Sequence, residues 1–284
     1  MVSMTDFPNQ ARTPGDPIEL LVSDIDGTLV NPDKGLTARA IDAVDALAKA
    51  RIGFTLVSSR PPRGMASLLK ALDVRLPFAA FNGASLVAPD LSVIKALHIP
   101  ADAARKALAL FEARGVGVWV FADGVWLLRD PEGPKVAHER HTVGFDPTVV
   151  DGFAAVIHRI DKMVGVSDDH AHLAQVEIEL QGLLGDTASA VRSQAYYLDV
   201  THAQANKGNA VRGLCAEIGV NPARTAVIGD ASNDVSMFHV AGFAVAMGQA
   251  SDAVKAEASA VTGANTEDGF AAAVNDLILP RARI

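Results

Sequence analysis

The chain has 284 residues, 49% of them hydrophobic and 20% charged, a balance typical of a globular protein large enough for two domains. Its formal net charge of -8 argues against a nucleic-acid partner, because tracking a phosphate backbone needs a basic surface. No apolar stretch is long enough to cross a membrane, so no membrane partner is expected. The single cysteine, Cys215, cannot form an internal disulfide and lies in a helical pattern. Residues 1–17 have no signal-peptide pattern and predict a loose tail, and we expect a cytoplasmic protein.

The first structured stretch ends in two closely spaced acids. Residues 18–22 form a mostly apolar run, and Asp24 and Asp26 follow it, with Gly27 and Thr28 directly after. The run predicts a buried strand, and in an open α/β sheet ligands collect at the carboxyl end of such a strand. Two acids on one face of a strand repel each other unless a cation or a proton lies between them. The alternative is a polar strand end at which Asp and Gly only form a turn.

Strands and helices then alternate up to residue 83. Helical spacing of apolar residues runs from Thr37 to about Gly53. A strand at 54–57 ends in Ser58, Ser59 and Arg60, and two prolines then open a helix that reaches residue 72. A third strand, 78–81, ends at Asn82. This alternation predicts an α/β fold with a doubly wound, Rossmann-like parallel sheet.

The pattern changes over residues 84–199. Apolar runs at 116–121 and 125–128 are separated by Ala-Asp-Gly, which predicts a hairpin. Further strands are expected at 163–166, 188–193 and 196–201, and helices at about 101–114 and 168–182. Because hairpins belong to antiparallel or mixed sheets, we predict that 84–199 is an inserted α/β cap domain and that 18–83 and 200–284 form a discontinuous core.

The alternating pattern returns after the insert. Residues 207–218 are helix-like, 225–228 form a strand, and 243–247 form another. Between the two strands lies the acid-rich loop Gly229-Asp230-Ala231-Ser232-Asn233-Asp234. The sequence therefore predicts that Lys207 and this loop join the first two acids at one edge of the sheet.

Four motifs in this order resemble those of the haloacid dehalogenase-like (HAD) phosphohydrolases: Asp-x-Asp-Gly-Thr at 24–28, Ser58, Lys207, and Asp230 with Asp234. The phrases Lys-Gly-Asn-Ala-Val from 207, Ala-Met-Gly from 246 and Thr-Glu-Asp-Gly from 266 look like the Cof-type branch, whose large cap is inserted between the second and third motifs. Two positions depart from the pattern. Ser58-Ser59-Arg60 stands where the family often has Thr-Gly-Arg, and Gln249 where Asn is common.

The resemblance implies a metal-assisted phosphoryl transfer. Asp24 would attack phosphorus to form an aspartyl-phosphate, and Asp26 would protonate the leaving alcohol and later activate water. The carboxylates of Asp24 and Asp230, with the backbone carbonyl of Asp26, would hold Mg²⁺, which prefers hard oxygen ligands. Ser58 would hydrogen-bond the phosphate, and Lys207 would supply a positive charge to it.

Five other polar residues are candidates for supporting roles. Asn233 and Asp234 would orient Lys207 or metal-bound water, and the Thr28 hydroxyl can hydrogen-bond a backbone group or an anion. Arg60 and Asn82 lie near the predicted mouth of the site, where they either contact substrate or tie loops together.

The implied activity is a Mg²⁺-dependent phosphatase acting on small phosphorylated metabolites, with sugar phosphates as the usual substrates of this branch. A phosphomutase shares the aspartyl-phosphate step and is an open alternative. A sensor that only binds a phosphorylated ligand is the third reading, and intact Asp24, Asp26, Lys207 and Asp230 count against it because a binding module needs no nucleophile.

Overall fold

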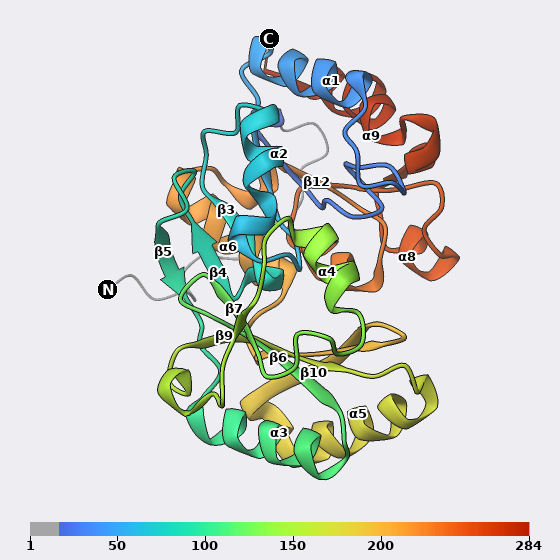
Figure 1. Ribbon diagram of the computed structural model, residues 1–284. Coiled ribbons are helices and arrows are strands. Elements are labelled where there is room, and N and C mark those ends of the chain that lie inside the picture. The colour runs from blue at the N-terminus through green and yellow to red at the C-terminus, as the bar shows by residue number, and fades with distance from the viewer. Residues whose placement is uncertain (1–16, 284) are drawn as a thin grey trace.

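The structure is a computed structural model that describes residues 17–283, so the predicted tail lies almost entirely outside the described residues. Two lobes are visible in Figure 1. The upper lobe is the core, which holds both ends of the described chain, and the lower lobe is the cap. No helix in the described range is long and apolar enough to span a membrane.

The core is built on a five-stranded parallel sheet in the order β14-β13-β12-β1-β2. Its strands are β1 (Leu20–Ser23), β2 (Gly53–Leu56), β12 (Thr225–Gly229), β13 (Phe243–Ala246) and β14 (Ala260–Val261). Each of the first four strands lies close to its predicted position. β1 is central because it pairs with β2 on one side and with β12 on the other. The predicted doubly wound α/β core is confirmed.

Both faces of this sheet are covered by helices, which explains why its strands are apolar throughout. Leu21 packs in the cluster on the face of α1 and α9, whereas Leu20 and Val22 pack in the cluster on the face of α6 and α7. The core helices are α1 (Ala38–Lys49), α2 (Ala66–Ala71), α6 (Lys207–Ile218), α7 (Val235–Phe238), α8 (Asp252–Ala256) and α9 (Gly269–Ala272), the last continuing as a π-helix over Ala273–Ile278. Thr37 caps α1 as predicted, accepting a hydrogen bond from the backbone N–H of Ala40 at 3.1 Å.

A second, small sheet follows β2. Its strands are β3 (Phe78–Ala80), β4 (Ser85–Val87) and β5 (Val93–Ala96), and the central strand β4 pairs antiparallel with both neighbours. Leu86 of β4 is buried with Val211 and Leu214 of α6, so this sheet belongs with the core. The sequence places 85–96 in the predicted insert because the alternating pattern ends at residue 83, and a change of pattern does not show which sheet a strand joins. We therefore propose a cap of residues 97–206 in place of 84–199.

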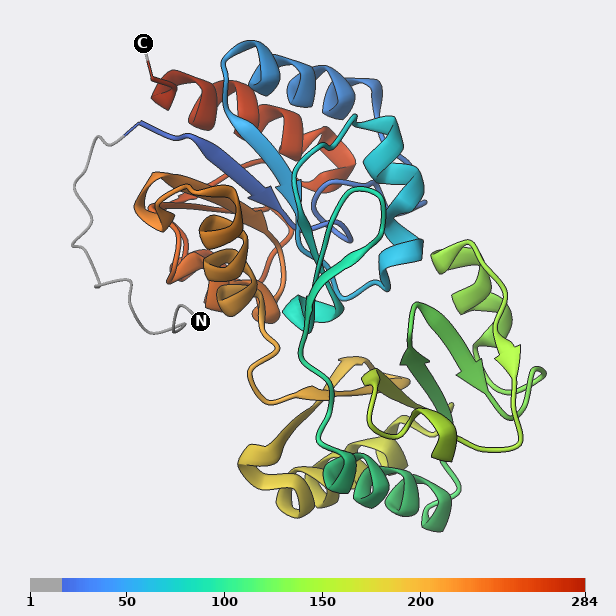
Figure 2. The same cartoon turned by 90° about the vertical axis from the view of Figure 1, so that its left-hand side faces the viewer.

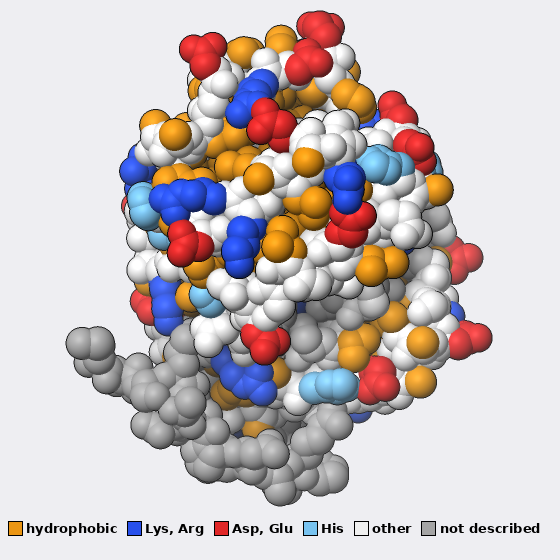
Figure 3. Space-filling view, turned by 90° about the horizontal axis from the view of Figure 1, so that it is seen from below, with side chains coloured by type: hydrophobic (Ala, Val, Ile, Leu, Met, Phe, Trp, Pro, Cys, Tyr) orange, Lys and Arg blue, Asp and Glu red, His pale blue; other side chains and the backbone are white. Residues whose placement is uncertain are grey.

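The cap contains one six-stranded mixed sheet in the order β10-β11-β9-β6-β7-β8. Its strands are β6 (Gly117–Ala122), β7 (Val125–Leu128), β8 (Thr148–Val149), β9 (Ile160–Val166), β10 (Ala188–Gln194) and β11 (Tyr197–His202). The predicted hairpin joins β6 to β7 through Asp123 and Gly124, both with positive φ. Helices α3 (Ala101–Ala113) and α5 (His170–Leu184) cover the face turned away from the core (Figure 1). Acidic and basic side chains are interspersed over the lower face of the cap (Figure 3).

Two chain crossings and one helix connect the lobes. The crossings, residues 97–100 and 203–206, run side by side between core and cap (Figure 2). The helix α4 (Val136–Val143) has no apolar stripe in its sequence and was not predicted. It rests on the 3-10 turn Pro62–Met65 of the core, where a Cβ on Gly64 would lie 3.4 Å from Val143. Just beyond the helix, Phe145 lies beneath the guanidinium of Arg63 at 4.5 Å. The cap is therefore in direct contact with the segment that follows Arg60.

Candidate active site

Three neighbouring parallel strands end at one edge of the core sheet, and a polar residue follows each. Asp24 follows β1, Ser58 lies two residues after β2, and Asp230 follows β12. The backbone N–H of Asp24 donates to Ile228 at 3.0 Å, which sets the ends of β1 and β12 side by side. Lys207 opens α6, whose first turn is capped by Asn206. Since the sheet is parallel, its topology alone brings these residues together.

Lys207 is the charged centre of this edge. Its Nζ lies 2.6 Å from Oδ1 of Asp24 and 2.6 Å from Oδ1 of Asp234, and its side chain is only 2% exposed. Burial alone would lower the pKa of Lys207, but the two carboxylates raise it above its ordinary value. The lysine is therefore a fixed positive charge beside Asp24.

Asp234 fixes both the lysine and the loop before it. Its second oxygen, Oδ2, accepts the backbone N–H groups of Asp230 and Ala231, each at 2.9 Å. This close approach requires a glycine at 229, where a Cβ would lie 2.4 Å from Cγ of Asp234. Both oxygens of Asp234 are therefore engaged in holding Lys207 and the loop at 230–231.

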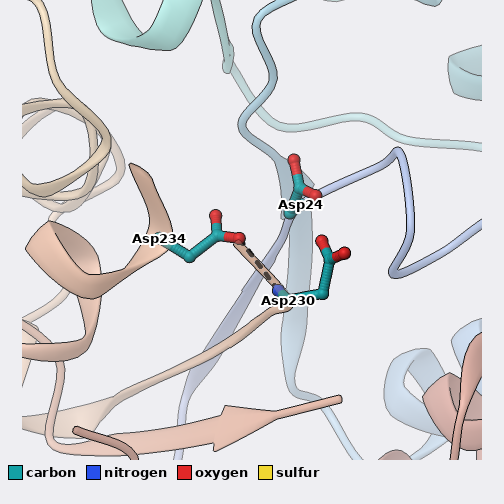
Figure 4. Close-up of side chains that lie close together, drawn as sticks. All are labelled: Asp24, Asp230 and Asp234. Atoms are coloured by element: carbon teal, nitrogen blue, oxygen red, sulfur yellow. Dashed lines mark hydrogen bonds between the residues drawn. The ribbon is translucent and has the colours of Figure 1, made fainter. Parts of the chain in front are cut away.

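Three carboxylates converge at the same point. Oxygen atoms of Asp24, Asp230 and Asp234 lie within 4.8 Å of one another. Figure 4 shows the carboxylates of Asp24 and Asp230 pointing in the same direction, with Asp234 beside them bonded to the Asp230 backbone. Burial raises the pKa of Asp24 to about 8, opposed by Lys207 and reinforced by Asp234 and Asp230. Burial and Asp234 also raise the pKa of Asp230.

This crowding of acids fits a hard divalent cation. A cation among the carboxylates would favour their ionised forms, and oxygen atoms are the donors that Mg²⁺ selects. Asp24 and Asp230 retain oxygens that Lys207 and the backbone do not occupy, so they fit this cation better than Asp234 does.

The loop after Asp26 packs tightly on Asp230. Gly27 has φ +83°, and a Cβ there would lie 2.3 Å from Oδ2 of Asp230, so only glycine fits. The Thr28 hydroxyl donates to Oδ1 of Asp230 at 3.3 Å. Gln249 donates to the carbonyl of Gly27, and its own oxygen accepts the backbone N–H of Asn265 at 3.1 Å. The glutamine at this departure from the family pattern therefore ties two loops at the site together.

Asp26 is held by two cations that the sequence did not connect with it. Arg60 donates to both of its oxygens, from Nε and Nη2, each at 2.7 Å, and Nζ of Lys34 lies 2.7 Å from Oδ1. Burial alone would raise the pKa of Asp26, but the hydrogen bonds and charges of Arg60 and Lys34 lower it to about 2. In this arrangement Asp26 is ionised and only weakly basic. To act as an acid, it has to be released from these cations.

The remaining predicted residues lie in the loops around the same edge. The Ser58 hydroxyl accepts the backbone N–H of Arg60 at 3.2 Å, and Ser58 is 1% exposed. Asn233 donates to the side chain of Asn82 at 3.2 Å, linking the loop after β12 to the turn after β3. No contact in the described range explains the Ser59 departure. Cys215 is buried, as its helical position predicted, and contacts the Thr225 hydroxyl at 3.3 Å.

Comparison with known proteins agrees with this geometry. The sequence model of the haloacid dehalogenase-like hydrolase family matches residues 21–274 of this chain. A Haemophilus influenzae protein named only provisionally as a phosphatase is 30% identical over 88% of this chain and 94% of its own length. The HMP-PP phosphatase of Cronobacter sakazakii is 27% identical over 82% of this chain and 85% of its own. A crystal structure of a haloacid dehalogenase-like hydrolase from Bacteroides thetaiotaomicron superposes with a TM-score of 0.83 at 26% identity, covering 90% of this chain and 98% of that one.

The family match spans both core segments and the cap, and the matched range contains Asp24, Ser58, Lys207 and Asp230. The predictions of an enzyme and of its superfamily are thereby confirmed, with phosphatases among its relatives. This chain belongs to the haloacid dehalogenase-like hydrolase family.

Proposed function

We propose that this chain is a Mg²⁺-dependent phosphatase that hydrolyses phosphate monoesters of small metabolites through an aspartyl-phosphate on Asp24. The observation that carries the proposal is the buried ion pair of Asp24 with Lys207 at 2.6 Å, directly beside the Asp230 carboxylate. Burying a carboxylate next to two other acids costs free energy. A residue that only binds a ligand has no need of such an environment.

Mg²⁺ would be held by the carboxylates of Asp24 and Asp230 and by the backbone carbonyl of Asp26. When bound, it supplies positive charge that offsets the repulsion between the attacking carboxylate and the phosphate. The ion and Lys207 would together place positive charge on two sides of the transferring phosphate.

In the first step, an oxygen of Asp24 forms a bond to phosphorus as the bond from phosphorus to the leaving alcohol breaks. Lys207 neutralises charge on the transferring group, and the Ser58 hydroxyl donates to one of its oxygens. In the second step, water attacks phosphorus and returns Asp24 to its free form. The phosphate leaves with the oxygen of that water.

Asp26 would serve both steps. After its release from the two cations it takes up a proton from solvent and gives it to the leaving alcohol, and as a carboxylate it then takes a proton from the attacking water. The pairing with Arg60 and Lys34 holds it ionised before substrate enters. We propose that the phosphate dianion draws one or both cations away, because both lie against Asp26 and a dianion attracts them more strongly than a single carboxylate does.

The proposed substrates are sugar phosphates. A phosphomutase would use the same first step, but it would have to return the phosphoryl group to the substrate and would respond to a bisphosphate activator.

The test is hydrolysis of a generic aryl phosphate by wild type and Asp24→Asn, each with Mg²⁺ and with a chelator. We expect turnover only for wild type with Mg²⁺, and a loss of at least about 10⁴-fold in Asp24→Asn. A urea unfolding curve of the variant serves as the control for folding. Asp24→Asn that is folded and still turns over would overturn the nucleophile assignment. Wild-type activity unaffected by the chelator would overturn the metal requirement.

A further inference from the structure

The core-facing side of the cap sheet carries buried polar groups whose hydrogen bonds are incomplete among the described residues. Across the described residues, four buried side-chain polar atoms accept or donate no hydrogen bond: Trp126 Nε1, both carboxylate oxygens of Asp199, and Asp268 Oδ1. Three of these four belong to the cap. Native proteins leave few such groups, and each one calls for a physical explanation.

Strand register puts these groups on one surface. Trp126, Phe121, Lys162 and Thr201 are aligned across β7, β6, β9 and β11. The adjacent aligned row runs from Leu128 through Trp119 and Val164 to Asp199. Side chains two apart on a strand share a face, so both rows point the same way. Phe121 meets Phe81 of the core with ring centroids 5.5 Å apart, which shows that this face is turned toward the core.

Lys162 and Asp199 form an ion pair on this face. Nζ of Lys162 lies 2.6 Å from Oδ2 of Asp199, and the two side chains are 10% and 9% exposed. The lysine has further N–H donors, and neither aspartate oxygen accepts a well-formed hydrogen bond. A buried pair left in this state is costly unless a third group completes it.

The pair is linked to the catalytic edge through Glu139 of α4. Tyr197, next on the Asp199 face, donates its hydroxyl to Glu139 at 3.3 Å. Burial raises the pKa of Glu139, and the charges of Lys162, Asp199 and Arg60 all act on it. Glu139 therefore touches this face of the cap sheet through Tyr197, and it also feels the charge of Arg60, which itself holds Asp26.

We propose that Lys162 and Asp199 bind the hydroxyl groups of the substrate's leaving group, and that this leaving group is a sugar or another polyol. Vicinal hydroxyls both donate and accept, so one can donate to Asp199 while its neighbour accepts from Lys162. Trp119, Phe121 and Tyr197 share this face of the sheet with the pair and are buried, so the pair lies in an apolar setting that strengthens its hydrogen bonds to a ligand. This inference rests on the proposed function and extends it to the residues that select the substrate.

The test measures kcat and KM for an aryl phosphate and for hexose, pentose and glycerol monophosphates in wild type, Asp199→Asn and Lys162→Met. For the best polyol phosphate, we expect the ratio of its kcat/KM to that of the aryl phosphate to fall about tenfold or more in each variant, mainly through KM. Lys162→Arg, which keeps a charged donor, should recover part of the ratio. Glu177→Gln, which alters the Arg192–Glu177 pair of α5 and β10, is the matched control and should leave the ratio unchanged.

Three results would overturn this inference. An equal loss on both substrate classes would indicate a structural role, an unchanged ratio would indicate no role, and wild type that cleaves aryl phosphate but no polyol phosphate would exclude the substrate class. In each case the Asp24-dependent aryl phosphatase activity survives in wild type. Absence of that activity would instead be failure of the proposed function itself.

Discussion

Two buried lysine–carboxylate pairs, one in the core and one in the cap, have the same spacing. They differ in how many of their hydrogen bonds the protein itself supplies. Lys207 lies 2.6 Å from Asp24, and Lys162 lies 2.6 Å from Asp199. In the core, Lys207 also reaches Asp234, whose other oxygen accepts two backbone N–H groups. In the cap, the oxygens of Asp199 accept no well-formed hydrogen bond from any described residue.

We propose that this difference separates two kinds of site. A catalytic charge has to be in place before the substrate arrives, so its hydrogen bonds are supplied by the protein. A group that recognises a substrate keeps its capacity for the ligand and is completed only when the ligand binds. The core pair fits the first description and the cap pair fits the second.

The largest effect is expected from a substitution that breaks the core pair. Lys207→Met leaves Asp24 and Asp234 buried without their cation, so we expect the free energy of unfolding to fall by about 3–5 kcal/mol. Turnover of an aryl phosphate should fall by roughly 10³-fold, because the charge on the transferring phosphate is lost. Urea unfolding and steady-state kinetics measure the two effects. Lys162→Met is the comparison. An equally large loss of aryl phosphate turnover in that variant would contradict the distinction between the two pairs.

The second prediction concerns Asp161, on the same strand as Lys162 but paired with His98, whose Nδ1 lies 3.1 Å away. Burial raises the pKa of Asp161 from 3.8 to about 6, partly offset by His98. Between these pH values the folded state holds the proton more tightly than the unfolded chain does. Stability contributed by the protonated acid is therefore lost as pH rises, by at most about 3 kcal/mol.

Asp161→Asn cannot titrate, so its free energy of unfolding relative to wild type should increase as pH rises from 4 to 7. Urea unfolding of both proteins at several pH values measures this. Curves that stay parallel across the range would show that burial does not perturb Asp161.

The smallest expected effect is at Gln249. Its side chain joins the carbonyl of Gly27 to the backbone N–H of Asn265, and both contacts are partly exposed. Gln249→Ala should lower the free energy of unfolding by about 1 kcal/mol and reduce turnover far less than Lys207→Met does. Thermal unfolding and aryl phosphate kinetics test this, and Gln249→Asn probes the residue common in the family. A loss of turnover as large as that of Lys207→Met would contradict this prediction and indicate that Gln249 takes part in catalysis.

The core site could be predicted from the sequence because its parts are local. Asp24, Lys207 and Asp230 each lie at the end of a strand or the start of a helix, and parallel topology brings such ends to one edge. The alternating elements before residue 83 and after residue 207 were therefore sufficient.

The cap surface could not be predicted in the same way. The pairing of Lys162 with Asp199 depends on strand register between β9 and β11. The contact of Arg60 and Lys34 with Asp26 depends on how distant loops fold back, and neither basic residue carries a pattern that reveals it. Helix α4, which brings Glu139 to this surface, lacks the apolar periodicity that identifies a helix in a sequence.

The most direct test of the account is to look for the phosphoryl group on Asp24. Wild type mixed with Mg²⁺ and excess substrate is quenched in acid within the first turnover, and the intact protein and its peptides are weighed. We predict an added phosphoryl group on the peptide that contains Asp24, absent from Asp24→Asn. Turnover in wild type that proceeds by burst-free kinetics, with no phosphoryl group on Asp24 at any quench time, would contradict the proposed mechanism.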